Sequence, residues 1–295
     1  MSPSSSSQAV KYPLPVKPSI AADALSASQA HYIHGHHPSV LKSHSARTVE
    51  NSAGYLLPHL RPGMDVLDCT ITIGFPKFVG GDAKVVGIEP PGASTVLEQA
   101  RHLAQDERLS NVKFEEADVH RLPFDAGSFD VVHVHQVLQH ISDQVNAVKE
   151  MKRVLKLGGV VAAREAIFDS FMFYPELPGL TKWLDLYKDV ARSSGGEPNA
   201  GKRLRAWAHA AGFADDDIHV TVSTSSFTTA DECRWWGEMW AERVVESEFA
   251  RTAQEKGLTT RAELEHLAQA WIDWSQHPDA WFAYMQGELV ARNGG

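Results

Sequence analysis

Three acidic residues follow runs of apolar residues in the first half of the chain: Asp68, Glu89 and Asp118. Such runs are typical of buried parallel strands, whose carboxyl ends meet at one edge of a sheet where ligands bind. An acid at the end of the second strand commonly accepts hydrogen bonds from ribose hydroxyls. We therefore predict a nucleoside site in which Glu89 holds the ribose, while Asp118 and Val119 contact the base.

The elements that must position these residues alternate between strands and helices. In the first part of the chain, apolar spacing predicts strands at 65–69, 84–89, 112–118, 129–135 and 160–165, with helices at 94–105 and 142–155. We expect Ser142 to cap the second helix and Gly158-Gly159 to end it. The last part reads as helices at 180–191, 201–211 and 261–275, an amphipathic stretch at 229–257, and strands at 218–227 and 281–291.

This order predicts an α/β fold: a Rossmann-like, mostly parallel, seven-stranded sheet with helices on both faces. We expect a disordered Ser/Pro-rich tail at 1–20 and a single domain at 21–295. Within that domain we expect a helical lead-in at 21–60, a cofactor-binding half at 61–170, and substrate-side helices with the last strands at 171–295, the helices forming a lid. His31, His34 and His37 lack a nearby Cys or acidic ligand run, and Pro38 interrupts their helix, so we predict no metal.

Several segments, in this order, resemble class I methyltransferases that use S-adenosylmethionine, in particular the branch similar to ubiquinone/menaquinone C-methyltransferases: 60–68, 86–89, 117–124, 129–132, 136–140 and 152–159. The resemblance spans roughly residues 30 to 292. It implies S-adenosyl-L-methionine as the cofactor, with Glu89 at its ribose and Asp118 and Val119 flanking its adenine. It also implies that His135 lies beside the methionine part.

One block departs from that family. After the first-strand acid the family places a Gly-x-Gly-x-Gly turn, but here Asp68 is followed by Cys69-Thr-Ile-Thr-Ile-Gly74. About five residues are missing, and with them the glycines that let a backbone approach the cofactor without a Cβ. We expect Asp68 and Thr70 to face the cofactor, with the branched side chains of 70–72 crowding it. The run 66–73 could even continue as strand, and Pro76 should disturb the following helix.

The sequence leaves three interpretations open. The first is a working methyltransferase with a shortened loop, acting on a secondary-metabolite-type acceptor. The second is a methyltransferase-fold protein that no longer methylates, and that binds or steers a small-molecule intermediate in a biosynthetic pathway. In the third, the chain lacks residues through a splice or gene-model error. A nicotinamide dehydrogenase is disfavoured, because it needs the same glycine turn.

Residues for catalysis and for the acceptor are harder to assign. His140 is the weak candidate for a base, although packing beneath the following helix is the preferred explanation of it. Trp235, Trp236 and Trp240 could line a pocket for an aromatic or polyketide-like acceptor, or could belong to the core. Cys69 should be buried and inert.

The composition of the chain limits the classes of molecule that we expect it to bind. Lys and Arg number 28 against 37 Asp and Glu, a net charge of −9, which argues against nucleic acid as the acceptor. No apolar run approaches the ~18 residues that a membrane span needs. The start of the chain lacks the pattern of a secretory signal, so we expect a cytoplasmic location. A small-molecule acceptor and other enzymes of the same pathway are the expected partners.

Overall fold

The protein is described by a computed structural model over residues 48–70 and 74–295. Within these ranges seven strands form one sheet in the order β3-β2-β1-β4-β5-β7-β6. Their bounds are β1 Val66–Asp68, β2 Val85–Glu89, β3 Val112–Glu116, β4 Phe129–His135, β5 Leu155–Tyr174, β6 Ile218–Phe227 and β7 Trp281–Arg292. The pairs from β3 to β5 are parallel, and β7 runs antiparallel to both of its neighbours. The predicted fold class is confirmed.

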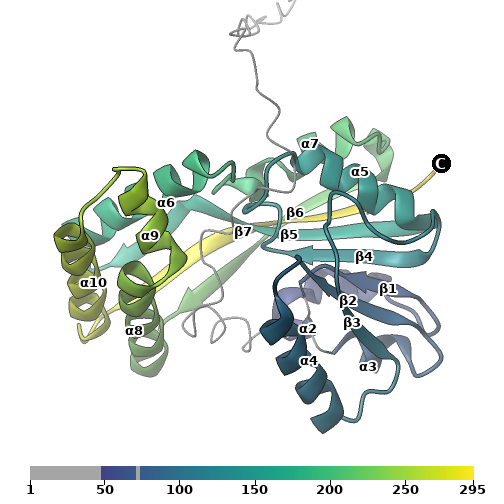
Figure 1. Ribbon diagram of the computed structural model, residues 1–295, viewed down its shortest axis with the longest axis horizontal. Helices are drawn as coiled ribbons and strands as arrows, with labels where there is room; N and C mark the ends of the chain where they lie inside the picture. The colour runs from purple at the N-terminus through teal and green to yellow at the C-terminus, as the bar shows by residue number, and fades with distance from the viewer. Residues whose placement is uncertain (1–47, 71–73) are drawn as a thin grey trace, which may run out of the picture.

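Helices cover both faces of this sheet (Figure 1). Those that precede β6 are α2 Val49–Ser52, α3 Phe75–Val79, α4 Ser94–Asp106, α5 Gln144–Val154, α6 Pro178–Ser193 and α7 Leu204–Ala210, with short 3-10 turns η2 Gly54–His59, η3 Ala200–Lys202 and η4 Asp215–Asp217. The last three are α8 Ala230–Glu246, α9 Glu248–Glu255 and α10 Arg261–Ser275. Apolar residues of α5 and α7 pack on one face of the central strands, and those of α2, η2 and α3 pack on the other.

Strand β5 is far longer than the predicted 160–165, because it begins at Leu155 and runs to Tyr174. Gly158 and Gly159 lie inside it, with Gly158 at a φ of 80°, and do not end the preceding helix. The helix ends at Val154 because Leu155 already pairs with β4. The apolar and aromatic residues beyond Glu165 continue as strand because β7 supplies an antiparallel partner along that length.

Two predictions about helix starts were wrong. The N-cap of α5 is Asp143, whose side chain accepts a hydrogen bond from the backbone of Asn146, and not Ser142. Pro76 does not disturb α3, because the helix begins at Phe75 and the proline occupies its first turn, where no N–H is needed. Continuation of β1 as strand is also wrong at Cys69 and Thr70, which form a turn; residues 71–73 lie outside the described ranges.

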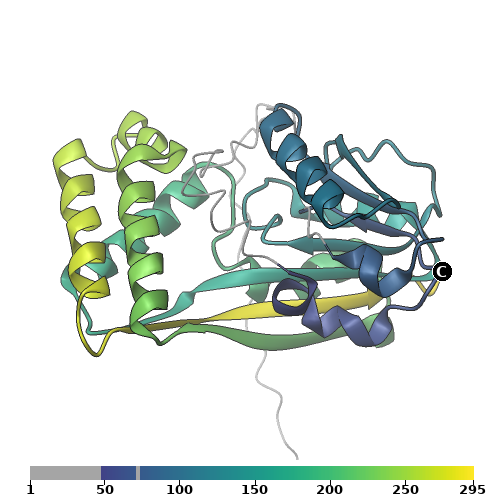
Figure 2. The same cartoon turned by 90° about the horizontal axis from the view of Figure 1, so that it is seen from below.

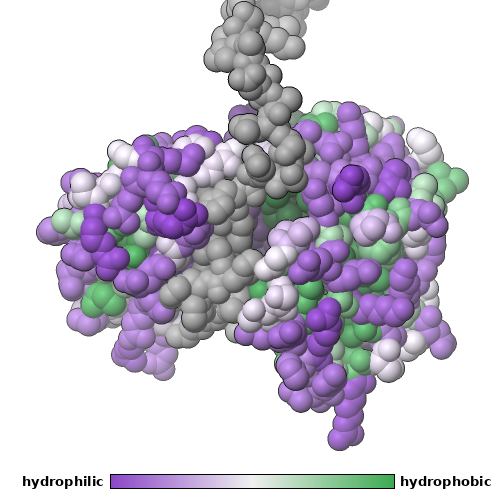
Figure 3. Space-filling view, in the orientation of Figure 1, coloured by the Kyte–Doolittle hydropathy of each residue, from purple (hydrophilic) through white to green (hydrophobic). Residues whose placement is uncertain are grey.

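Strands β5, β6 and β7 extend past the parallel strands and carry a helical lobe made of α6, α8, α9 and α10 (Figures 1 and 2). The predicted stretch 229–257 is two helices, broken at Ser247, whose hydroxyl caps α9 by accepting the Phe249 N–H. The predicted helix 201–211 is divided between η3 and α7. On the face shown in Figure 3, hydrophilic residues dominate the outer surface of this lobe.

The predicted tail 1–20, most of the lead-in at 21–60, and His31, His34 and His37 lie outside the described residues. Of the lead-in, α2 and η2 are described, and they pack their apolar residues against the sheet. Among the helices at 48–70 and 74–295, none combines the length and apolar character that a membrane crossing requires.

Candidate functional site

The predicted acidic residues come together at one edge of the sheet. Asp68 and Glu89 end the adjacent parallel strands β1 and β2. Asp118 lies two residues beyond β3, and the N–H of Ala117 donates to the carbonyl of Glu89 at 2.9 Å, which holds the two segments side by side. Glu89 and Asp118 are half-buried, and Val119 is buried. The edge therefore presents two carboxylates and an apolar side chain.

His120 positions Asp118 and was missed by the sequence analysis. The Asp118 Oδ1 atom lies 2.9 Å from both the backbone nitrogen and the Nδ1 atom of His120. The other ring nitrogen of His120 lies 2.7 Å from the carbonyl oxygen of Ser142. The imidazole thus links the loop after β3 to the start of α5. Its place two residues after a strand-end acid was the available signal.

A buried Asp–His pair lies at the carboxyl end of β1. The Oδ1 atom of Asp68 lies 2.8 Å from the Nδ1 atom of His133 on β4, and neither side chain is more than 2% exposed. Thr70 donates its hydroxyl to Asp68 Oδ1 at 3.2 Å and accepts the backbone N–H of His135 at 3.0 Å. The Asp68 carboxylate is therefore held inside the protein, in contrast to Glu89. His133 was also missed, although its alternation with His135 places both on one face of β4.

Cys69 follows this pair and is buried. Burial raises the pKa of its thiol well above the usual range, and the negative charges of Asp68 and Glu89 raise it further. The thiol stays protonated near neutral pH, so Cys69 is a packing residue and not a nucleophile.

Glu165 fixes the loop that follows β4. Its carboxylate is fully buried and accepts the backbone N–H groups of residues 137, 138 and 139 at 2.9, 2.8 and 3.1 Å. Gln136, which opens this loop, has a φ of 57°, an uncommon conformation for a residue with a side chain. His140 lies in the same loop, half-buried, with its Nε2 atom 3.0 Å from Nε2 of Gln139. Its proposed role as a base stays a prediction.

The predicted pocket tryptophans fall into two environments. Trp240 is 3% exposed and packs within the helical lobe, with its ring centroid 4.6 Å from that of Trp183. Trp235 and Trp236 are half-buried on the same helix. The Trp236 ring stacks on Phe227 of β6 at 4.3 Å, so it lies against the sheet, while Trp240 belongs to the core.

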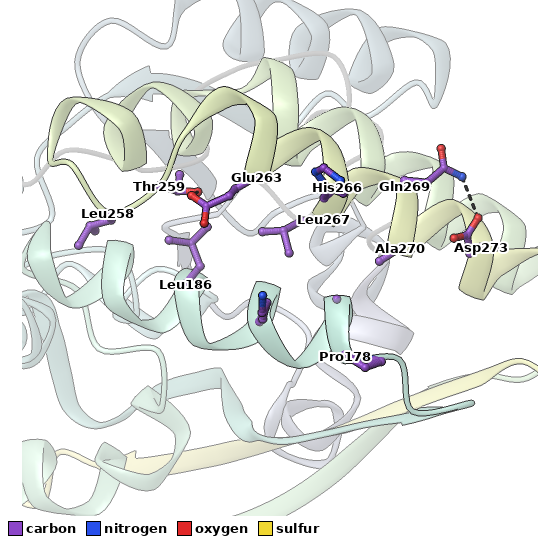
Figure 4. A pocket seen from close by; sticks show the side chains of 12 residues that line it. Pro178, Leu186, Leu258, Thr259, Glu263, His266, Leu267, Gln269, Ala270 and Asp273 are labelled. Atoms are coloured by element: carbon purple, nitrogen blue, oxygen red, sulfur yellow. Dashed lines mark hydrogen bonds between the residues drawn. The ribbon is translucent and has the colours of Figure 1, made fainter.

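A groove of about 670 Å³ runs between α6 and α10 in the helical lobe (Figure 4). Lys182 and Leu186 line one side, and Glu263, His266 and Asp273 line the other. The helices approach closely at Gly179, where a Cβ would lie 2.4 Å from that of Ala270. Helix α10 stands at the opposite end of the molecule from β1, β2 and β3 (Figure 1), so this groove is separate from the acidic edge.

Similarity to known proteins decides the family. An uncharacterized methyltransferase of Schizosaccharomyces pombe is 30% identical over 276 residues, which cover 89% of this chain and 96% of that protein. The chain belongs to the methyltransferase family. The methyltransferase domain matches residues 73–163, a range that begins after β1.

A second relative agrees with this assignment, and one solved structure shares the fold. The ubiquinone/menaquinone biosynthesis C-methyltransferase of Idiomarina loihiensis is 30% identical over 177 residues, covering 54% of this chain and 69% of that one. The crystal structure of the YcgJ protein from Bacillus subtilis has the same fold, with a TM-score of 0.51 at 19% identity over 81% of this chain and 98% of that one.

Proposed function

We propose that this methyltransferase transfers a methyl group from S-adenosylmethionine to a small-molecule acceptor of the secondary-metabolite type. The observation that carries the proposal is the pair of half-buried carboxylates, Glu89 and Asp118, side by side at the carboxyl edge of β2 and β3. Family membership and the parallel sheet support it. Other enzymes of the same pathway would supply or consume the small molecule.

The residues at this edge fit the nucleoside half of the cofactor. Carboxylates accept hydrogen bonds, and Glu89 stands where ribose hydroxyls are bound in doubly wound sheets. Asp118, oriented by His120, is available to the polar edge of an adenine, and Val119 offers it an apolar surface. Asp68, Glu89 and Asp118 together also make this edge negative, which favours a ligand that carries a positive charge.

When bound, S-adenosylmethionine supplies an electrophilic methyl group on a positively charged sulfur. The chain's own task is then to place the acceptor in line with that group and to exclude water. Glu165 serves this task by holding the loop 136–140 rigid beside the ends of β1 and β4. His140, carried on that loop, is the proposed base for an acceptor that must lose a proton.

A second candidate function is a methyltransferase-fold protein that binds or steers an intermediate without methylating it. The observation that favours it is the enclosure of Asp68, which is 2% exposed and whose Oδ1 atom contacts both His133 and Thr70. The connection from Asp68 to α3 also contains Gly74 as its single glycine. The methionine half of the cofactor would have to pass this closed strand end.

Calorimetric titration with S-adenosylmethionine separates the two candidates without knowledge of the acceptor. The first predicts saturable binding with a micromolar Kd, followed by transfer of labelled methyl to a phenolic acceptor from a panel. The Glu89→Gln variant should bind more weakly, while Glu98→Gln on the exposed side of α4 should not. A folded chain that releases no heat would contradict the first candidate and support the second.

A further inference from the structure

A band of polar side chains crosses one face of the long strands β5, β7 and β6, between two apolar cores. Register pairs Arg164 with Glu288, and pairs Gln286 with Ser223. Residues directly opposite one another in a sheet point to the same face, so these four side chains share it. Arg164 and Gln286, at 7% and 1% exposure, are buried, which is costly for polar groups unless they are paired or serve a ligand.

The charged part of the band is balanced. Arg164 Nε lies 3.2 Å from Glu288 Oε1, and the guanidinium donates to the hydroxyl of Ser223 at 3.0 Å. Arg164 also donates to the carbonyl of Asn51 at 2.6 Å, and Thr221 donates to Glu288 at 3.0 Å. The positive charge of Arg164 is balanced by the negative charge of Glu288, so the pair has no net charge with which to attract a charged ligand.

The neutral part is a chain of amides. Gln136, at the end of β4, donates to Gln286 at 3.3 Å, and Gln286 donates to the hydroxyl of Ser225 at 2.8 Å. Gln136 is the residue with positive φ that opens the loop held by Glu165. The band therefore reaches from the antiparallel strands to the end of β4, which pairs with β1 of the proposed cofactor edge.

Two buried donors near the band have no hydrogen-bond partner among residues 48–70 and 74–295: the Tyr55 hydroxyl and the Trp236 Nε1 atom. Burial raises the pKa of Tyr55 well above its usual range, and the charge of Glu288 raises it further, so the hydroxyl keeps its proton. An unpaired buried donor destabilises the fold, and a ligand with an acceptor oxygen would relieve that cost by accepting its hydrogen bond.

Aromatic rings border the band on the side of the helical lobe. Tyr284 lies one step along the same face of β7 from Gln286, and its ring centroid is 6.5 Å from that of Trp236. Phe227, on β6, stacks on Trp236 at 4.3 Å. Flat apolar surfaces thus adjoin neutral hydrogen-bonding groups.

We propose that this band recognises the methyl acceptor, and that the acceptor is a neutral aromatic compound bearing hydroxyl or carbonyl groups. The inference rests on the proposed function. A carboxylate ligand would leave a net negative charge buried beside Glu288, and an ammonium would leave a net positive one beside Arg164, so both are disfavoured. A neutral ring accepts from Tyr55 and Trp236 and exchanges hydrogen bonds with Gln286.

The test uses three probes with the same naphthol ring system and different charges: neutral 2-naphthol, anionic 6-hydroxy-2-naphthoate and cationic 6-aminomethyl-2-naphthol. Binding is followed by calorimetry on the full chain saturated with S-adenosylhomocysteine. The neutral probe should bind on the order of tenfold more tightly than either charged one, equivalent to about 1.4 kcal/mol. Equal affinities, or binding of none of the probes to the saturated chain, would overturn the proposal.

Charge variants make the test specific. Glu288→Gln leaves Arg164 unbalanced and should shift the preference by about tenfold toward the naphthoate. The double variant with Arg164→Gln is neutral again and should restore the preference for 2-naphthol. Met285→Leu is the control, because Met285 lies on the opposite face of β7, and it should leave the preference for 2-naphthol unchanged. The same preference in the single and the double variant would contradict the proposal.

If Glu288→Gln does not fold, Gln286→Leu decides the question. It should weaken 2-naphthol binding about tenfold and leave the affinity for S-adenosylhomocysteine unchanged; unchanged 2-naphthol binding would overturn the proposal. Failure of the chain to bind S-adenosylhomocysteine is a separate result that overturns the proposed function. Titration with 2-naphthol in the absence of the nucleotide then tests the polar band alone.

Discussion

Two regions along the long strand β5 differ in what their side chains do. Level with its middle, near Arg164, the parallel strands end, and the acids that follow them, such as Glu89 and Asp118, stay half-exposed. At its far end, rings pack on rings, and Trp183, Trp271 and Trp274 are among the largest side chains with no exposed surface. The tryptophans are more conspicuous in the sequence, but most of them hold the helical lobe together. The proposed cofactor site lies instead at the edge with the smaller and more exposed residues.

The largest expected loss of stability comes from removing a buried aromatic ring in the helical lobe. Trp271→Ala should lower the free energy of unfolding by about 3–5 kcal/mol, because removing the ring leaves a cavity. The centroid of the Trp271 ring lies 4.8 Å from that of Trp183 and 5.5 Å from that of Phe173. Urea denaturation measures the change. Trp235→Ala, at a half-buried ring on α8, is the matched control and should cost less than half as much. Equal losses would show that the lobe is not organised around its buried rings.

Glu165→Gln should destabilise the protein by about 2–3 kcal/mol, because an amide replaces one of the oxygens that accept three backbone N–H groups. The loss should appear first at residues 136–140, as faster amide hydrogen exchange there than in the helical lobe. Uniformly faster exchange across both regions would contradict a local role for this carboxylate.

Glu89→Gln should weaken S-adenosylmethionine binding by about 10- to 30-fold, near 1.4–2 kcal/mol, and change the melting temperature little. The carboxylate lies at the strand end and is not part of either apolar core. Binding is measured by calorimetry and stability by thermal unfolding. A large stability loss with unchanged affinity would make Glu89 a structural residue and remove the contrast with Trp271.

The smallest effect concerns pH. The pKa of Cys69 and that of Tyr55 are raised in the folded chain, chiefly by burial. Above the ordinary thiol pKa the unfolded chain loses a proton that the folded chain keeps, so stability falls as pH rises. With an unfolded thiol pKa near 8.5, the loss should reach about 1.4 kcal/mol by about pH 9.5. Cys69→Ala should remove that part of the slope; parallel curves for the variant and the wild type would contradict burial of the thiol as its source.

Sequence reasoning reached the fold because strands such as β4 and β6 have uniform local patterns, and their bounds agree with the prediction. It failed where contacts with distant parts of the chain determine where an element begins or ends. The length of β5 depends on its pairing with β7, and the tolerance of Pro76 depends on where α3 begins. Two residues that orient the acids were also missed. His120 lies only two residues after Asp118, whereas the role of His133 arises from a contact between strands that no local spacing reveals.

The same distinction applies to the candidate site. That Asp68, Glu89 and Asp118 meet at one edge follows from parallel-strand geometry alone. That Asp68 is enclosed while Glu89 is half-exposed depends on His133, which lies 65 positions away on a neighbouring strand. The polar band on β5, β7 and β6 was not found either, because its members are brought together only by the antiparallel register.

We propose that the edge formed by β1, β2 and β3 holds a nucleoside cofactor although no Gly-x-Gly-x-Gly turn follows Asp68. The most direct test is a calorimetric titration with S-adenosylhomocysteine on the wild type and on a variant with Gly-x-Gly-x-Gly restored after Asp68. We predict micromolar binding by the wild type, tighter binding by the restored variant, and loss of affinity in both on Glu89→Gln. Absence of binding by both folded proteins, or binding that is indifferent to Glu89, would contradict the account.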